Sequence, residues 1–270
     1  AGMSRAAGLP RARKRFGQHF LHDRTILERI VATLAPRPGE HVVEIGPGRG
    51  ALTAWLAPAV QRAGGATLDV IEIDRDLAAH LASGFAAQGV AVHAADALEF
   101  DFAALATARG GPLRVVGNLP YNISTPLLFH LLEQRGAIAD LHVMLQREVV
   151  DRMVARPGTR AYGRLTIMLA PWTEIERLFD VGPGAFSPPP RVWSSVARLR
   201  MRPRPALDVS PCFARLVAAA FSARRKTLRN ALRSFVASET IAACGIDPGA
   251  RPGTLTPQNY AALARAADGL

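Results

Sequence analysis

The stretch that decides the fold is His41-Val42-Val43-Glu44-Ile45 followed by Gly46-Pro47-Gly48-Arg49-Gly50. Its first half has the composition of a buried strand, and the glycine turn ends that strand before an apolar helix that begins near Ala51. Glycines let the backbone approach a ligand, and a helix start presents free N–H groups. The pattern predicts a nucleotide cradle. Gly46, Gly48 and Ala51 also satisfy the dinucleotide fingerprint, so this turn alone leaves a nicotinamide cofactor open.

Three later apolar runs are each closed by a polar side chain. Glu72 lies at the end of the run 68–73, Asp96 follows the run 90–94, and Asn118 ends the run that begins at Leu113. The carboxyl ends of parallel strands meet at one edge of a doubly wound sheet, so we expect these side chains to line one site with the glycine turn. The spacing of Glu72 suits ribose hydroxyls, and Asp96 could accept from an adenine amino group. Each acid could instead cap a helix, but the repetition favours a ligand site.

The turn Asn118-Leu119-Pro120-Tyr121 predicts a base-binding site. Pro120 fixes its own φ and restricts the residue before it, so the tetrapeptide has few shapes. The Asn118 amide oxygen and the carbonyls around Leu119 could hold the exocyclic amino group of a nucleobase, and Tyr121 could stack on the same base. An ordinary strand-to-helix turn is the alternative, because Asn and Pro are common in turns.

The formal net charge of +11 is concentrated at the two ends of the chain. Residues 1–24 hold six basic residues against one acidic residue, and residues 186–270 hold thirteen against four. The part between them is slightly acidic. Basic ends on such a body predict a nucleic-acid binder, with phosphates held outside a small-molecule site. Arginine richness by itself could reflect genomic base composition, but its segregation does not follow from that.

Length and cysteine content predict an intracellular globular protein. With 270 residues, the chain can form an α/β domain plus a smaller appendage without disulfides. Cys212 and Cys244 lie far apart and lack partners at metal-ligand spacing, so we expect thiols in a reducing compartment and no metal site. No apolar run is long enough for a membrane span and no signal-peptide core begins the chain, which favours a cytoplasmic location.

We predict three parts: a basic N-terminal segment (1–24), an α/β domain (25–202) and a small helical domain (206–270). The boundary lies at Arg202-Pro203-Arg204-Pro205. In the α/β domain we expect Ser124 to cap a helix, His142 to be a satisfied core histidine, and the proline-rich residues 184–190 to form a stiff loop that joins no sheet.

A basic stripe, Arg224-Arg225-Lys226 with Arg229 and Arg233, places positive charge at the start of a helix expected over residues 226–236. A helix start favours acidic residues. The misplaced charge therefore favours phosphate binding over the alternative, a solvated helix face.

The chain closely resembles the bacterial small-subunit ribosomal RNA adenine N6,N6-dimethyltransferase family from Arg13 to about Tyr260. Any one matching piece would be a weak signal, but so many in order are specific. The pieces are Lys14-Arg15-Phe16-Gly17-Gln18 with Phe20-Leu21, Glu44-Ile45-Gly46-Pro47-Gly48, residues 118–125, Met144-Leu145-Gln146-Arg147-Glu148-Val149-Val150, Ala161-Tyr162-Gly163-Arg164-Leu165, Ser187-Pro188-Pro189-Pro190 and Arg224-Arg225-Lys226-Thr227-Leu228-Arg229-Asn230.

The resemblance implies a Rossmann-like α/β methyltransferase that binds S-adenosylmethionine. Its substrate is expected to be two adjacent adenosines in a hairpin near the 3′ end of small-subunit rRNA, each methylated twice in an assembling 30S particle by a monomeric enzyme. The cofactor site is expected to comprise His19, Leu21, Gly46, Gly48, Glu72, Asp96, Ala97 and Asn118. The catalytic turn is expected to comprise Asn118, Leu119, Pro120 and Tyr121, with Phe186 stacking on the base, and RNA contacts are expected at Arg13, Lys14, Arg15, Arg147, Arg224, Arg225, Lys226 and Arg229.

Two residues depart from the family pattern. His19 stands where Asn is typical, which puts its cofactor contact in doubt, and Trp193 stands where Asp is usual after the prolines. Three rival functions stay open on sequence grounds: a large-subunit rRNA adenine methyltransferase, an assembly factor that acts mainly by binding, and a nicotinamide oxidoreductase.

Overall fold

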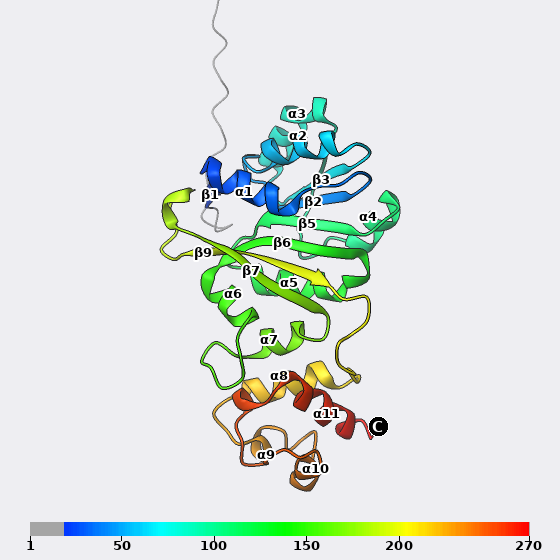
Figure 1. Cartoon of the computed structure of the whole chain (residues 1–270), viewed down its shortest axis with the longest axis vertical. Coiled ribbons are helices and arrows are strands. Elements are labelled where there is room, and N and C mark those ends of the chain that lie inside the picture. Colours follow the sequence, from blue (N-terminus) through cyan, green and yellow to red (C-terminus); the bar gives the residue numbers. More distant parts are fainter. Residues whose placement is uncertain (1–18, 270) are drawn as a thin grey trace, which may run out of the picture. The chain divides into compact units, whose positions relative to one another are not determined.

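The computed structural model describes residues 19–269, which form two compact units (Figure 1). One unit runs to Arg147 and includes Leu178–Arg198; the other comprises Glu148–Arg177 and the residues from Leu199 onward. The predicted basic residues Arg13, Lys14 and Arg15, and most of the predicted segment 1–24, lie outside the described residues.

A seven-stranded sheet has the order β4-β3-β2-β5-β6-β9-β7. The pairs that join β2 to β3, β3 to β4, β2 to β5 and β5 to β6 are parallel. The chain winds one way from β2 to β4 and then crosses to β5 on the other side of β2, which creates a topological switch point at β2 and β5. The strands are β2 (His41–Ile45), β3 (Thr67–Glu72), β4 (Ala91–Ala94), β5 (Leu113–Asn118), β6 (Ile138–Gln146), β7 (Thr173–Val181) and β9 (Ser194–Met201).

Helices follow most of these strands, as the periodicity predicted. In the first unit they include α1 (Arg24–Leu34), α2 (Thr53–Ala63), α3 (Arg75–Gly84), α4 (Phe102–Arg109) and α5 (Ser124–Glu133). The α6 helix (Arg147–Met153) begins at Arg147, where the first segment of that unit ends, and its other residues belong to the second unit. The second unit also contains α7 (Arg164–Leu169), α8 (Phe213–Ser222), α9 (Leu228–Ala231), α10 (Ser238–Ala243) and α11 (Pro257–Ala267).

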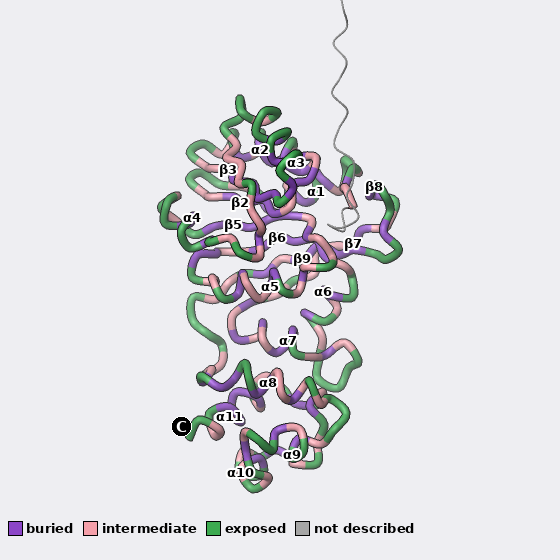
Figure 2. The backbone as a smooth tube through the Cα atoms, turned by 180° about the vertical axis from the view of Figure 1, so that it is seen from behind, coloured by how far each residue is buried: buried purple, intermediate pink, exposed green. Residues whose placement is uncertain are grey.

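The core of the first unit lies between the sheet and its helices. Asp23 caps α1 by accepting from Thr25 N at 2.9 Å and Ile26 N at 3.2 Å, so the apolar stripe of the helix is set against the sheet. Val42, Val70 and Val116 are fully buried beneath it. Figure 2 shows buried stretches running along the strands, with exposed residues in the connections and on helices such as α3.

Four local predictions require correction. Ser124 is the first residue of α5, and Ile123 occupies the N-cap position. The Ser124 hydroxyl donates to Tyr121 O at 3.2 Å and caps no helix N–H. Residues 186–187 do join a sheet: β8 (Phe186–Ser187) pairs antiparallel with β1 (Phe20–Leu21), since the prolines begin only at residue 188. The helix expected over 226–236 is regular only in α9, although Leu228, Leu232 and Val236 keep helical spacing in the core.

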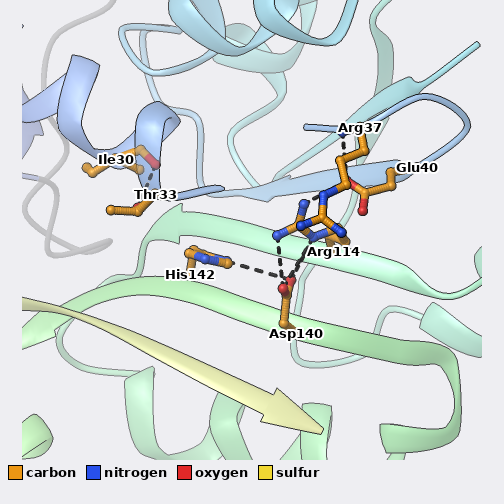
Figure 3. A network of polar contacts seen from close by, with 7 residues as sticks. All are labelled: Ile30, Thr33, Arg37, Glu40, Arg114, Asp140 and His142. Atoms are coloured by element: carbon orange, nitrogen blue, oxygen red, sulfur yellow. Dashed lines mark hydrogen bonds and ion pairs between the residues drawn. The ribbon is translucent and has the colours of Figure 1, made fainter. Parts of the chain in front are cut away.

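The fourth correction concerns His142, which is buried as predicted but is not satisfied. Its Nδ1 lies 3.6 Å from Asp140 Oδ1, and neither ring nitrogen has a hydrogen-bond partner among the described residues. Asp140 instead accepts from Arg114, which also donates to Glu40 at 2.6 Å (Figure 3). Burial raises the pKa of Asp140, but the neighbouring His142 and Arg114 outweigh it and leave that pKa below its ordinary value. This network ties together the amino ends of β5 and β6, the edge of the sheet opposite the strand ends predicted to bind ligand.

Candidate active site

A cavity of about 300 Å³ opens at the carboxyl ends of β2, β3 and β5 in the first unit. Its size falls in the range of about 300–1,000 Å³ that is usual for small-molecule sites. The walls come from β1, the glycine turn, the ends of β3 and β4, and the turn after β5. The cavity therefore gathers the predicted residues His19, Leu21, Gly46, Gly48, Glu72, Asp96, Ala97, Asn118, Leu119, Pro120 and Tyr121.

The glycine turn has a backbone conformation that residues with a side chain rarely adopt. Gly46 and Gly48 have φ values of +67° and +57°, in the left-handed region. A Cβ at Gly48 would lie 2.9 Å from two ring carbons of Phe20, closer than real carbons approach. Gly46 is held by its N–H, which donates to Ile71 O at 3.0 Å. The turn thus keeps bare backbone facing the cavity.

Glu72 fixes this turn from the neighbouring strand. Its Oε2 accepts from Gly48 N at 3.0 Å, and its Oε1 accepts from Asp74 N at 2.9 Å. Burial raises the pKa of Glu72, and the backbone donors offset part of that rise. Each carboxylate oxygen retains acceptor capacity beyond its backbone bond, so the group can receive ligand hydroxyls while it shapes the turn.

Glu44 is a buried acid of this cavity that sequence reasoning left unassigned. It is 2% exposed, lines the cavity, and accepts from Thr53 Oγ1 at 2.6 Å. Burial raises its pKa to about 8, so the carboxyl is mostly protonated near neutral pH. A glutamate inside an otherwise apolar strand was the available signal, because a charged residue is rarely buried without a role.

Asp96 makes a capping hydrogen bond and also lines the cavity, so both roles predicted from the sequence apply to it. Its Oδ1 accepts from Leu98 N at 2.9 Å, which is a local capping bond. It also lines the cavity beside Ala97, which is 7% exposed. The second carboxylate oxygen makes no hydrogen bond within the described residues, so it can accept from a ligand.

The Asn118 turn meets the glycine turn across the sheet. Asn118 Nδ2 donates to His19 O at 3.0 Å, while no described residue donates to its Oδ1. Leu119 is fully buried and its N–H donates to Met144 O at 3.1 Å, so the turn is anchored to β6. The close approach of the two strands depends on Gly117, where a Cβ would lie 2.4 Å from Ile45 O.

Tyr121 forms the aromatic wall beside Asn118. Its ring stacks on His19 with centroids 5.6 Å apart and planes at 29°, and its hydroxyl hydrogen-bonds Ser194 Oγ at 2.6 Å. Burial raises the pKa of Tyr121 and the Ser194 bond lowers it, with burial dominant. His19 Nδ1 donates to Pro188 O at 2.8 Å, so its imidazole is held in place against the Tyr121 ring.

Phe186 does not line the cavity. Its side chain is 2% exposed and packs in the core with Leu21, its partner in the β1–β8 pair. Ser187, the next residue, lines the cavity instead. In this structure the predicted stacking ring is therefore turned into the protein.

The described basic residues of the predicted RNA surface are exposed but differ in their contacts. Arg147 is half-exposed and lies 3.6 Å from Asp180 in the first unit. In the second unit Arg225, Lys226 and Arg229 are exposed. Arg224 donates from Nη2 to Thr159 O and Arg160 O, so it also fastens a loop of its own unit.

Residues 19–269 contain neither a helix that could span a membrane nor a metal-binding cluster. No helix there combines the length and apolar character required to cross a bilayer. In the same range, His, Cys, Asp and Glu side chains do not gather in groups of three that could hold a metal ion.

A glycine turn after β2, an acid at the end of the next strand and ligand residues at a switch point define a Rossmann-like nucleotide-cofactor enzyme. The asparagine–proline turn in the same cavity adds acceptors that could hold an amino group of a second ligand. Residues 10–268 match the family described as ribosomal RNA adenine dimethylase.

Curated relatives agree with that match. The chain is 54% identical over 256 residues to the ribosomal RNA small subunit methyltransferase A of Aromatoleum aromaticum, covering 94% of this chain and 93% of the relative. It is 52% identical over 257 residues to the protein of the same name from Alcanivorax borkumensis, covering 94% and 89%.

Solved structures share the fold. A dimethyladenosine transferase from Plasmodium falciparum superposes with a TM-score of 0.73 at 22% identity, covering 93% of this chain and 98% of that one. The 23S rRNA methyltransferase ErmE gives a TM-score of 0.69 at 28% identity, covering 92% and 99%. The chain belongs to the ribosomal RNA adenine dimethylase family and is an S-adenosylmethionine-dependent methyltransferase.

Proposed function

We propose that the protein dimethylates the N6 amino groups of two adjacent adenosines in a hairpin near the 3′ end of small-subunit rRNA, within an assembling 30S particle. The observation that carries this proposal is the shared cavity: the Asn118 turn lies in the same space as the glycine turn, Glu72 and Asp96. The small-subunit substrate is supported by the names and high identity of the curated relatives. Action as a monomer in the cytoplasm is part of the same proposal.

The residues of the cavity fit S-adenosylmethionine. The glycine turn presents backbone where a side chain would collide, Glu72 can take the ribose hydroxyls, and Asp96 keeps one oxygen for the adenine amino group. When bound, the cofactor supplies a methyl group on a positively charged sulfur. Glu44, mostly protonated, adds little negative charge to the cavity despite its burial.

The protein's contribution to the chemistry is to position the amino group. The lone pair of an adenine amino nitrogen is delocalised into the ring, so the nitrogen becomes nucleophilic only when its N–H bonds leave the ring plane. Asn118 Oδ1 and a carbonyl near Leu119 are acceptors that can pull those bonds and aim the lone pair. Positive charge grows on the nitrogen as the methyl group arrives, and such acceptors stabilise it electrostatically. No strong base is required, because the positively charged methylated nitrogen is acidic and releases one proton to solvent.

The target base must leave its stack to enter the cavity. Tyr121 offers an aromatic surface that offsets part of the unstacking cost. The monomethylated product retains one N–H, so a second transfer is possible in the same pocket once the spent cofactor has been replaced by a new S-adenosylmethionine.

The decisive experiment incubates the protein with labelled S-adenosylmethionine and small subunits that lack the modification, and then maps the labelled nucleotides. We expect four methyl groups per subunit on two adjacent adenosines. Label confined to large-subunit RNA, or to another base, would overturn the proposal. Parallel titrations with S-adenosylmethionine and with NAD separate a methyltransferase from an oxidoreductase. We expect S-adenosylmethionine to bind and NAD not to bind.

A further inference from the structure

Residues 188–194, which we call the rim segment, are tied to the cavity at both ends. Pro188 O accepts from His19 Nδ1 at 2.8 Å, and Ser194 Oγ hydrogen-bonds the Tyr121 hydroxyl at 2.6 Å. His19 and Tyr121 are stacked on each other and line the cavity. The rim segment is therefore held beside the wall that receives the target base.

Trp193 stands on this segment with its indole 53% exposed. A Cβ built on Gly182 would lie 3.6, 3.7 and 3.8 Å from three adjacent carbons of the six-membered ring. Approach to the ring edge would make these distances clearly unequal, so their similarity places the Gly182 backbone against the ring face. Trp193 O accepts from Arg147 N at 2.9 Å, which holds the main chain. The Gly182 backbone thus lies towards one face of the indole, while about half of the Trp193 surface is exposed.

The surroundings favour a nucleobase over a protein surface as the occupant. Val192, the preceding residue in the chain, is 44% exposed, and Arg191 before it is an exposed cation. An exposed flat ring and an exposed cation two residues apart on one segment match a base with its phosphate, because bases stack on aromatic side chains and arginine contacts the backbone. A stable protein interface requires a much wider apolar area than two side chains offer.

The other aromatic rings near the cavity leave this role open. Phe186 is buried in the core, Tyr121 has its ring stacked on His19, and Phe20 has the Arg49 guanidinium over its ring. Trp193 is the large aromatic side chain of the described residues that is most exposed at this rim.

We propose that Trp193 is a stacking platform for an unpaired base adjacent to the target adenosine, with Arg191 contacting the phosphate of that nucleotide. This inference rests on the proposed function and extends it, because it specifies a substrate whose flanking base is also unstacked. The bound RNA is then held at two points, the target base in the cavity and its neighbour on the rim segment.

The test compares wild-type protein with Trp193→Ala, Trp193→Phe and Arg191→Ala, using a synthetic unmethylated RNA hairpin with two adjacent loop adenosines as the probe. Loss of one stacked base lowers affinity by about tenfold, so Trp193→Ala should bind about tenfold more weakly with an unchanged salt slope. Trp193→Phe should retain most of the affinity. Arg191→Ala should reduce the salt slope by about 0.7, as expected for one contact to a single strand. Titration with S-adenosylmethionine should be the same for all four proteins.

Fluorescence gives a second measurement on the full chain. The chain has three tryptophans, so Trp55→Phe with Trp172→Phe leaves Trp193 as the only one. Its emission should be quenched by the hairpin but not by the cofactor. Equal hairpin affinity for wild type and Trp193→Ala, or unquenched emission, overturns the inference even when wild-type protein methylates subunits. Weakened binding of Trp193→Ala to whole subunits alone would assign the indole to a protein contact and overturn it too. Absence of methylation by wild type would instead remove the proposed function.

Discussion

Asn118 Nδ2 lies 3.0 Å from the backbone carbonyl of His19, a residue 99 positions earlier in the chain. A carbonyl oxygen only accepts hydrogen bonds, so the atom that faces it must be the amide nitrogen. The orientation of the Asn118 amide is therefore fixed by His19, the residue before β1, and its oxygen remains as an acceptor. The backbone at His19 thus prepares the catalytic turn for an incoming amino group.

Asn118→Ala should lower the rate of methyl transfer by about 100-fold or more, as observed generally when one transition-state hydrogen-bond partner is removed. Binding of S-adenosylmethionine should largely survive, because the glycine turn, Glu72 and Asp96 are untouched. Single-turnover transfer to unmethylated small subunits measures the first quantity, and calorimetric titration measures the second. Gln88→Ala, which removes an exposed amide, is the control and should be fully active.

His19→Ala retains the backbone carbonyl that Asn118 contacts but removes the ring that stacks on Tyr121. We therefore expect a smaller loss of rate than for Asn118→Ala. Near-normal transfer by Asn118→Ala would show that the amide takes no part in the reaction.

The pKa of Glu44 predicts a pH dependence of stability. Its pKa is about 8 in the folded protein against 4.5 when exposed, because burial disfavours the charge. Between these values the folded state holds a proton that the unfolded state has released. The contribution of this bound proton to the free energy of unfolding is fully present below pH 4.5. It is lost as pH rises towards 8, at about 1.4 kcal/mol per pH unit.

Urea denaturation of wild type and Glu44→Gln at pH 5.5, 6.5 and 7.5 checks this prediction. The difference in unfolding free energy between the two proteins should change in favour of Glu44→Gln as pH rises. Glu28→Gln, at an exposed position of α1, controls for the removal of one negative charge. If the unfolding free energies of wild type and Glu44→Gln change with pH in parallel, the raised pKa of Glu44 is contradicted.

The sequence predicted the strands and the contents of the cavity because both follow from local pattern. Apolar runs end at Glu72 and Asn118, and parallel strands bring such ends to one edge. It could not predict the direction of the Phe186 ring, which depends on β8 pairing with a strand near the other end of the chain. Glu44 was missed because its apolar neighbours already explained the strand. Arg224 was assigned to phosphate by its charge, whereas its contacts with Thr159 and Arg160 carbonyls depend on tertiary structure.

Gly117→Ala should damage both stability and activity. The added Cβ would lie 2.4 Å from Ile45 O, a backbone atom that can move only with its strand. Overpacking of this kind costs about 1–3 kcal/mol. The displacement also reaches Asn118, the next residue, and a misplacement of about 1 Å can lower a rate by about 100-fold. Thermal denaturation and single-turnover methylation measure the two effects.

Gly136→Ala is the matched control for Gly117→Ala. Nothing lies within 4 Å of the Cβ that it adds, and its φ is not positive. Its stability should change by less than about 0.5 kcal/mol. If Gly117→Ala and Gly136→Ala had the same stability and activity, β2 and β5 would be able to move apart without loss of free energy.

The basic side chains of the second unit predict a salt-dependent contribution to RNA binding. Arg225, Lys226 and Arg229 are exposed, whereas Arg224 is engaged with backbone carbonyls, so the variant that isolates phosphate contacts changes the first three to Ala and keeps Arg224. Each lost phosphate contact reduces the slope of log affinity against log salt by about 0.7–0.9, so three contacts reduce it by about 2 or more. Binding to unmethylated small subunits at several salt concentrations gives this slope. Arg37, Arg62 and Arg75 are exposed in the first unit, and their triple alanine variant removes the same charge as a control. If both variants flatten the slope equally, net charge accounts for binding and the Arg225–Arg229 surface has no special role; a loss confined to the first variant locates the phosphate contacts there.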